Sequence, residues 1–246
     1  MKVSFFSTCL GDQLYPEVAM SAIRVLERLG CEVDLPAAQV CCGQPALNSG
    51  YQDEARTVAR RLIETFADAE HVVAPSGSCS GMIRHYFPQL FQHDAGLLRE
   101  AESFANRVFE LSQFLVQVLG VHQLDGSFPH KVTYHPSCHG ARLLGIREEP
   151  LILLRAIRDL ELVPLPKADD CCGFGGTFAI KLASISAAIV DEKVAHISET
   201  NAHYVVGTDL GCLMNITGRM QVKGVPVQGV HMAELLDRAM SKGAPA

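Results

Sequence analysis

The sequence predicts an α/β fold built from two pseudo-repeated α/β units, each with a small parallel sheet flanked by helices. The first observation behind this prediction is a repeat of cysteines: the order Cys, Cys-Cys-Gly, Cys occurs once in each half of the 246-residue chain. The second is that short apolar runs alternate with longer amphipathic segments in each half, which is the pattern of parallel strands joined by helices. Because both patterns recur in the same order, a duplicated unit explains them together.

The first unit begins with a strand over residues 2–7 and a helix over residues 16–30, with Pro16 in the first turn and Gly30 at the end. A strand, a helix and a third strand follow over residues 31–36, 51–69 and 71–75. The second unit repeats this order, with its elements over residues 131–136, 148–160, 161–166, 180–199 and 203–208. Strands that alternate with helices of this length indicate a parallel sheet covered on both faces.

The boundary between the units is predicted at Leu124–Pro129, the stretch between the halves with the composition of a linker. This places one domain over residues 1–126 and the other over residues 127–246. The hydrophobic content of 48% is enough to supply a core.

Composition excludes several classes of function. The net charge is −6 and the basic residues are scattered, so we expect no nucleic-acid partner. The N-terminal apolar run is too short for a secretion signal, and Arg155 interrupts the run LILLRAI, so we expect no transmembrane segment. Nine cysteines, an odd number without a secretion signal, favour metal or redox use in a reducing compartment, and we expect the cytoplasm.

The repeated cysteines are predicted to converge in space, because each follows the carboxyl end of a predicted strand and parallel strands end at the same edge of a sheet. The first set is Cys9, Cys41, Cys42 and Cys79. The second set is Cys138, Cys171, Cys172 and Cys212.

Four converging thiolates are typical of a zinc site or an iron–sulfur cluster. Zinc modules commonly take two ligands from a Cys-x-x-Cys turn, and the chain contains no such turn. Adjacent cysteines favour a cluster, because neighbouring thiolates reach two different iron atoms where the backbone turns tightly between them. The glycines that follow permit such a turn and let amide groups approach the sulfurs. Zinc remains the alternative metal.

Other interpretations of the cysteines stay open. Cys31 has no counterpart in the other half and is expected to be a core residue. The adjacent pairs would also suit a vicinal disulfide or a redox-active thiol. The segment GFGGT, over residues 173–177, looks like a phosphate-binding loop, but the full Gly-x-Gly-x-x-Gly fingerprint is absent.

Longer stretches carry a family resemblance. They are CCGQPALNSGY, PSGSCSGMIRHYFP, YHPSCHGARLLGI, DDCCGFGGTFAIK and GTDLGCLMNI. Together with the doubled cysteine pattern, they resemble the cysteine-rich CCG-domain iron–sulfur proteins, a group that includes the heterodisulfide reductase B subunit, and more closely the lactate-utilisation protein A family. The resemblance covers essentially the whole chain.

The resemblance implies an iron–sulfur electron-transfer subunit of a complex that oxidises L-lactate to pyruvate, an oxidoreductase that does not use NAD. Two partner subunits are implied, one of them ferredoxin-like. The eight cysteines of the two sets would be the ligands of one or two clusters per chain, of the 4Fe-4S type. The heterodisulfide reductase relative has a fifth cysteine in each motif, where this chain has Ser76 and Asp209. We expect Asp209 to cap a turn or a helix, with ligation of iron as the alternative.

Oxidation of a 2-hydroxy acid needs a base, a cation for the carboxylate and an electron acceptor. His135 and His139 flank Cys138, and Arg142 follows one turn later, so these three are the candidate catalytic residues. The alternative is that the histidines hydrogen-bond cluster sulfurs or backbone. The chain shows no flavin or nicotinamide fingerprint, which makes it an incomplete dehydrogenase on its own. A heterodisulfide or thiol-disulfide reductase subunit and a zinc-binding scaffold remain alternative functions.

Overall fold

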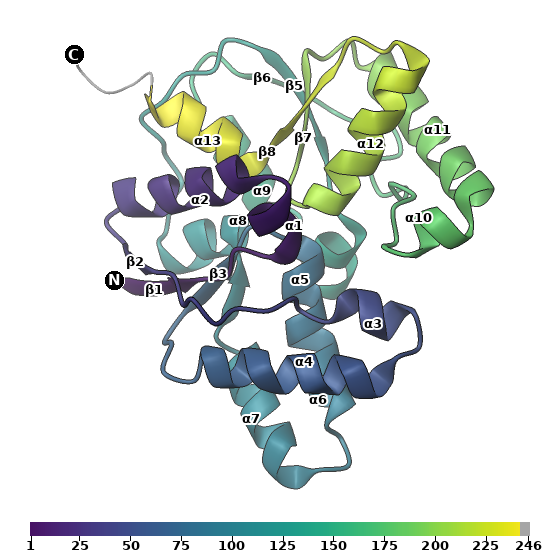
Figure 1. The fold of residues 1–246 in the computed structure, drawn as a ribbon. Helices are drawn as coiled ribbons and strands as arrows, with labels where there is room; N and C mark the ends of the chain where they lie inside the picture. Colours follow the sequence, from purple (N-terminus) through teal and green to yellow (C-terminus); the bar gives the residue numbers. More distant parts are fainter. Residues whose placement is uncertain (242–246) are drawn as a thin grey trace.

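The computed structural model describes residues 1–241, which form two four-stranded sheets flanked by helices (Figure 1). The first sheet has the order β2-β1-β3-β4, from β1 (Lys2–Phe5), β2 (Glu32–Asp34), β3 (Val72–Ala74) and β4 (Val108–Glu110). The second has the order β6-β5-β7-β8, from β5 (Lys131–His135), β6 (Glu161–Val163), β7 (Tyr204–Gly207) and β8 (Gln228–His231). Neighbouring strands in both sheets are parallel. The predicted fold of two pseudo-repeated α/β units is confirmed.

Helices connect the strands in both halves. Those of the first half are α1 (Cys9–Gln13), α2 (Pro16–Arg28), α3 (Gln44–Asn48), α4 (Gln52–Thr65), α5 (Gly77–Gly81), α6 (Phe87–Leu90), α7 (Ala95–Ala105) and α8 (Leu111–Gln113), with the π-helical turns η1 (Met82–Tyr86) and η2 (Phe114–Val118). Those of the second half are η3 (His139–Leu143), α9 (Glu149–Arg155), α10 (Phe178–Lys181), α11 (Ala183–Glu199), α12 (Leu210–Lys223) and α13 (Met232–Ser241). None of the helices described is both long and apolar enough to cross a membrane.

Several elements differ from the sequence prediction: α7, α12 and α13 were not predicted, and the helix predicted over residues 148–160 ends at Arg155. The strands β4 and β8 were also not predicted, because each leads directly into a helix, α8 and α13 respectively. The helix predicted over residues 180–199 is divided into α10 and α11, because the backbone of Leu182 leaves the helical region, with φ −126° and ψ 49°.

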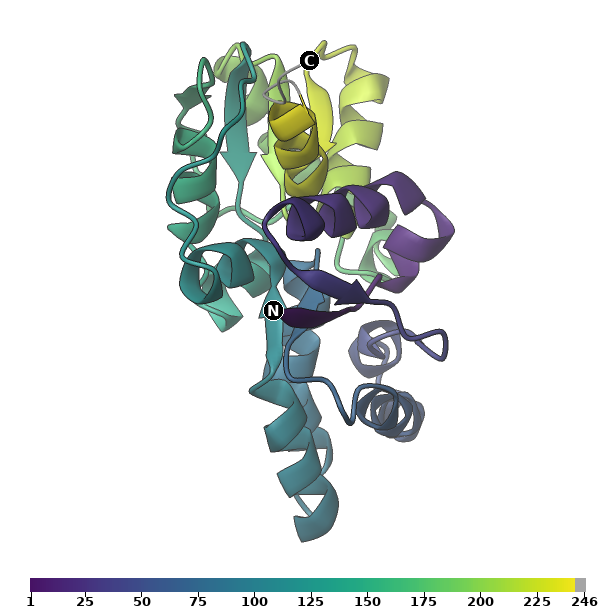
Figure 2. The same ribbon diagram turned by 90° about the vertical axis from the view of Figure 1, so that its left-hand side faces the viewer.

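The two halves are held together by helices that each pack on the other half. Helix α2 packs against α13, as Figure 2 shows, and α9 packs against α8 and η2. As a result one hydrophobic cluster contains buried residues from both halves, among them Val3, Phe114, Val132 and Leu236. Burial of this shared apolar surface fixes the position of one sheet relative to the other.

The predicted linker takes part in this packing. Leu124 and Phe128 are buried in the shared cluster, and the carbonyl of Gly126 accepts a hydrogen bond from the amide of Arg158 at 3.1 Å. The division into domains at residues 126 and 127 stays a prediction.

Candidate metal centre

The first cysteine set lies at the carboxyl edge of the first sheet. Cys9 begins α1 shortly after β1, and Cys79 lies in α5 shortly after β3. Cys41 and Cys42 lie on the loop between β2 and α3, where Gly43 has a φ of 83°. That left-handed conformation favours glycine and turns the chain directly after the adjacent thiols.

The second set repeats this arrangement. Cys138 directly precedes η3, and Cys212 lies in the first turn of α12. Cys171 and Cys172 precede Gly173, whose φ is 79°. A Cβ atom at Gly173 would lie 2.7 Å from the carbonyl oxygen of Ser186 on α11, so this turn requires glycine.

Within each half the thiols contact one another in a chain that follows the same order. The order in the first half is Cys9, Cys41, Cys42 and Cys79. The order in the second half is Cys138, Cys171, Cys172 and Cys212, and the Sγ atoms of the last two are 2.9 Å apart. The predicted convergence of four thiols in each half is therefore present in the structure.

One thiol in each set has a strongly lowered pKa. Hydrogen bonds from neighbouring thiols of the same set lower the pKa of Cys41 to about 3 and that of Cys171 to about 2. The amide of Gly43 lies 3.5 Å from the sulfur of Cys41, and the amide of Gly173 lies 3.3 Å from the sulfur of Cys171. Because the thiolate is the form that binds a metal, each set contains a stabilised first ligand.

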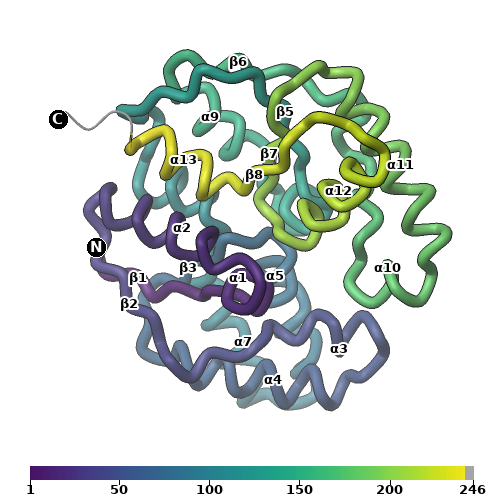
Figure 3. Tube along the Cα trace, turned by 45° about the horizontal axis from the view of Figure 1, so that its top comes forward, coloured from purple at the N-terminus to yellow at the C-terminus, as the bar shows by residue number. Residues whose placement is uncertain are grey.

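All eight cysteines line one cavity of about 190 Å³ between the two halves. Helices α3 and α10, one from each half, lie on the same side of the molecule (Figure 3), and the hydroxyls of Ser49 and Thr177 at their ends are 3.1 Å apart. The two sets of cysteine thiols, which are soft metal ligands, therefore face the same cavity. Four thiols per set, with amides directed at sulfur, fit an iron–sulfur group in each half.

Where α5 meets η3, the backbones of the two halves are in close contact. A Cβ atom at Gly77 would overlap the hydroxyl of Ser137 and lie 3.2 Å from the nitrogen of Gly140. The amide of Gly77 donates to the carbonyl of Thr208 at 3.2 Å. Since α5 carries Cys79 and η3 follows Cys138, these contacts fix the separation of the two cysteine sets.

Ser76 and Asp209, at the positions of the additional cysteines in the heterodisulfide reductase relative, are both helix N-caps. Ser76 Oγ accepts from the amide of Cys79 at 3.2 Å, and Asp209 Oδ1 accepts from the amide of Cys212 at 3.4 Å. Asp209 Oδ2 also accepts from the amide of Ser78 at 2.8 Å. The capping role expected for Asp209 is present in the structure.

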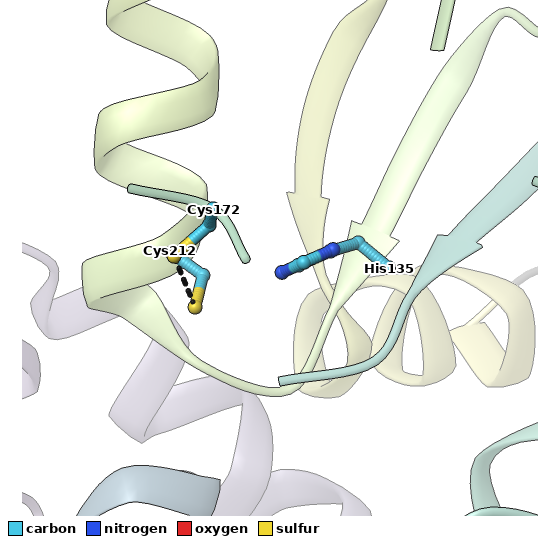
Figure 4. Close-up of side chains that lie close together, drawn as sticks. All are labelled: His135, Cys172 and Cys212. Carbon is cyan, nitrogen blue, oxygen red and sulfur yellow. Dashed lines mark hydrogen bonds between the residues drawn. The ribbon is translucent and has the colours of Figure 1, made fainter. Parts of the chain in front are cut away.

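His135 lies at the end of β5 against the buried thiols of the second set. Its ring points toward Cys172 and Cys212 (Figure 4), and its ligating atom and the two sulfurs lie within 4.8 Å of one another. The side chain is buried, and neither ring nitrogen has a hydrogen-bond partner among the residues described. Burial lowers the pKa of His135 to about 3, which keeps the imidazole neutral.

Lys193 of α11 is a second buried polar group in this half. Its exposed fraction is 0%, and its Nζ donates to the carbonyls of Lys167 and Ala168, each at 3.0 Å. These carbonyls belong to the loop that leads to Cys171, so the ammonium group anchors the loop. Lys193 was not predicted as a site residue from the sequence; the signal was its position three residues after the buried Val190, on the core face of the helix.

The other candidate catalytic residues lie in different places. His139 lines the shared cavity, with Nε2 3.0 Å from Nε2 of Gln44 and Nδ1 3.4 Å from the sulfur of Cys138. Arg142 is exposed and donates to the carbonyl of Asp169 at 2.6 Å, so it does not line the cavity. The structure therefore does not bring His139 and Arg142 together around one space.

Comparisons with known proteins agree with this arrangement. A family model described as a cysteine-rich domain, CCG, matches the chain twice, over residues 3–84 and 132–217. The chain is 52% identical to lactate utilization protein A of Geobacillus thermodenitrificans over 237 residues, which are 96% of this chain and 99% of that protein. It is 47% identical to lactate utilization protein A 2 of Bacillus cereus over 242 residues, which are 98% of this chain and 100% of that protein.

Among solved structures, a hypothetical protein from Helicobacter pylori has a similar fold. Its TM-score is 0.68 at 10% identity, and the match covers 97% of this chain and 49% of that one. At this identity the likeness concerns the fold alone.

Proposed function

The chain belongs to the cysteine-rich CCG-domain family and, within it, to the lactate utilization protein A proteins, and we propose that it is an iron–sulfur electron-transfer subunit of a complex that oxidises L-lactate to pyruvate. The observation that carries the proposal is the pair of four-thiol sets that face one cavity. The family membership supports the substrate, and the donor set supports the cofactor.

Each set would hold one 4Fe-4S cluster through its four cysteines, and a bound cluster supplies one-electron transfer. Oxidation of a 2-hydroxy acid releases two electrons. Two sites that face the same space match that number. The lowered pKa values of Cys41 and Cys171 favour thiolates at both sites, and the amides of Gly43 and Gly173 stabilise them.

The charge of the cavity wall favours relay of electrons over binding of lactate on this chain. Among the residues described there, the lining includes no lysine or arginine to hold a carboxylate, while Asp209 contributes a carboxylate of its own. We therefore assign the lactate site to a partner subunit. Of the three candidate catalytic residues only His139 lines the cavity, and with the lactate site on a partner we assign it to hydrogen bonding with the sulfur of Cys138 rather than to catalysis.

The proposed complex contains two partner subunits, one of them ferredoxin-like, and acts in the cytoplasm. The relatives' name, which refers to utilisation of lactate, supports the substrate. The odd number of cysteines supports a reducing compartment.

Anaerobic purification tests the cofactor. Iron, sulfide and zinc are counted in the wild-type chain, and the reduced protein is examined by EPR. We expect about eight iron and eight sulfide per chain if both sites hold 4Fe-4S clusters, and about half of each in Cys171→Ser. Cys31→Ser is the matched control, because Cys31 lies in the core away from both sets, and it keeps the full iron content. Stoichiometric zinc without sulfide would favour the zinc scaffold and refute the proposal.

A thiol-disulfide reductase is the second candidate, favoured by one observation. Cys171 is exposed, has a strongly lowered pKa and is adjacent to Cys172, as an attacking thiolate with a resolving partner would be. Turnover of a low-molecular-weight disulfide by the purified chain, abolished in Cys171→Ser, would support this function. Its absence in a protein that carries clusters would support electron transfer.

A further inference from the structure

We propose that His135 donates a hydrogen bond to a cysteine sulfur of the second set, and thereby raises the reduction potential of the cluster held there. This inference rests on the proposed function, since it concerns an iron–sulfur group at that site. Among the residues described, the first set has no equivalent donor.

Strand register identifies the residue that stands in the place of His135 in the first half. His135 is paired with Gly207 across β5 and β7 and lies three residues before Cys138. Phe6 lies three residues before Cys9, and its amide donates to the carbonyl of Val73 at the end of the corresponding strand pair. Both side chains are 1% exposed. The two halves therefore place a phenyl ring and an imidazole ring at the same position.

The residues around the two rings differ in polarity in the same way as the rings themselves. Phe6 belongs to an apolar cluster that also contains Leu62 and both buried cysteines of its set, Cys42 and Cys79. Ala55 lies against Gly43 in the first half, and Ser186 lies against Gly173 in the second. Leu62 follows Ala55 by the same number of residues as Lys193 follows Ser186, so Leu62 and Lys193 occupy corresponding positions. Behind the buried cysteines, the first half therefore has the apolar pair Phe6 and Leu62, where the second half has His135 and Lys193.

The position of the imidazole indicates what it donates to. Lys193 is bonded to two carbonyls and offers no acceptor, because an ammonium group only donates. Neither ring nitrogen of His135 has a partner among the residues described, and a neutral imidazole carries one N–H. The sulfurs of Cys172 and Cys212 are the acceptors toward which the ring points (Figure 4). A buried N–H without an acceptor is costly, so a thiolate sulfur is its natural partner.

Such a bond changes the energy of reduction. A cluster gains negative charge when it accepts an electron, and a hydrogen bond to a ligand sulfur stabilises the more negative state. The negative charge of Asp209 near Cys212 acts in the opposite direction and lowers the reduction potential at the same site. The contribution of His135 is therefore measured by comparing variants of this site, and not by comparing the two sites with each other. The imidazole of His135 is buried and does not line the cavity, so it contacts the cysteine ligands from the protein side.

The test uses the full-length chain, purified anaerobically with its clusters and labelled with ¹⁵N-histidine. Pulsed EPR of the reduced wild-type protein is expected to show a weak ¹⁵N coupling in one cluster signal, and redox titration gives the midpoint potential of that signal. In His135→Phe, which installs the residue of the first half, the coupling from residue 135 is lost and that midpoint becomes more negative, while the other cluster is unchanged. Any ¹⁵N coupling that remains in the variant belongs to His139, whose Nδ1 is 3.4 Å from the sulfur of Cys138. His135→Gln, which keeps an N–H donor, restores part of the shift.

Three results would overturn the inference. The first is an unchanged midpoint in both variants. The second is a ¹⁵N coupling as strong as that of a direct iron ligand. The third is the absence of any histidine coupling in the wild-type protein, which needs no variant to fold. Absence of iron and sulfide from the wild-type protein is a separate result, which overturns the proposed function and this inference with it.

Discussion

The hydroxyl of Ser76 donates a hydrogen bond to the carboxylate of Asp209 at 3.2 Å, and this contact joins the two halves beside both cysteine sets. Each residue caps the helix that carries the last cysteine of its own half, Cys79 for Ser76 and Cys212 for Asp209. Because Asp209 Oδ2 also accepts from the amide of Ser78, one carboxylate serves the N-termini of two helices. At these two positions the chain therefore has oxygen atoms that cap helices and join the halves.

Asp209→Ala is expected to destabilise the fold. The change removes the cap of α12 and leaves the amide of Ser78 without its acceptor, at a cost of about 2 kcal/mol. Asp209→Asn keeps an acceptor oxygen and should cost about half as much. Urea unfolding of both variants and the wild type measures the difference. Equal stability of Asp209→Ala and the wild type would show that the carboxylate does not hold the two helices.

The cysteine sites were predictable because their ligands are chemically distinctive and occur twice. The prediction that these eight thiols converge does not depend on exact helix boundaries, because it requires only that each cysteine follows a strand. His135 was singled out because it lies near Cys138, but its place behind Cys172 and Cys212 depends on how three strands end together.

The shared cavity was not predictable from the sequence. It depends on the packing of α2 against α13, and the apolar faces of those helices look like the faces of any surface helix. The burial of Lys193 was also not predictable, for a different reason. A lysine on a helix is ordinarily solvated, and only the carbonyls of Lys167 and Ala168 explain its burial.

The buried Glu110 should make stability fall as pH rises through the range between 4.5 and 7. Burial raises its pKa to about 7, although its carboxylate caps α8 through the amides of Ser112 and Gln113. The folded protein therefore keeps a proton that the unfolded chain releases near pH 4.5, and up to about 3 kcal/mol is lost by pH 8. Glu110→Gln removes this dependence.

Urea unfolding at pH 5 and pH 8 measures the effect of Glu110. The difference in stability between the wild type and Glu110→Gln isolates this residue, because other titrating groups contribute to both proteins. The wild type should lose stability relative to the variant between the two pH values. A difference that does not change with pH would contradict the raised pKa.

Asp237 is expected to stabilise the contact between the two halves. It accepts from Arg24 Nε at 2.8 Å and from Arg28 Nη1 at 2.6 Å across α2 and α13. Burial alone would raise the pKa of Asp237, but these two arginines lower it overall. Asp237→Asn should cost about 2 kcal/mol at pH 7. Because the folded pKa is the lower one, this contribution is present above about pH 4 and is lost as pH falls further.

An exposed ion pair provides the control for Asp237. Asp125 contacts Arg158 at 3.4 Å with 84% of its side chain exposed. Asp125→Asn should therefore change stability by less than about 0.5 kcal/mol. The two variants are compared by thermal and urea unfolding at pH 7 and pH 3. An equal effect of both at pH 7 would show that Asp237 is no more than a surface charge.

Gly77→Ala tests whether close backbone contact holds the two cysteine sets together. The added methyl group would overlap the hydroxyl of Ser137, which is itself held by the amide of Gly140 at 3.1 Å, so the helix has no room to move away. We expect a loss of about 1–3 kcal/mol. Gly218→Ala is the matched control, because a Cβ atom there meets nothing within 4 Å and helical alanine should gain about 0.5–1 kcal/mol. Opposite signs in urea unfolding support the contact, whereas a gain in both variants would show that α5 and η3 pack loosely.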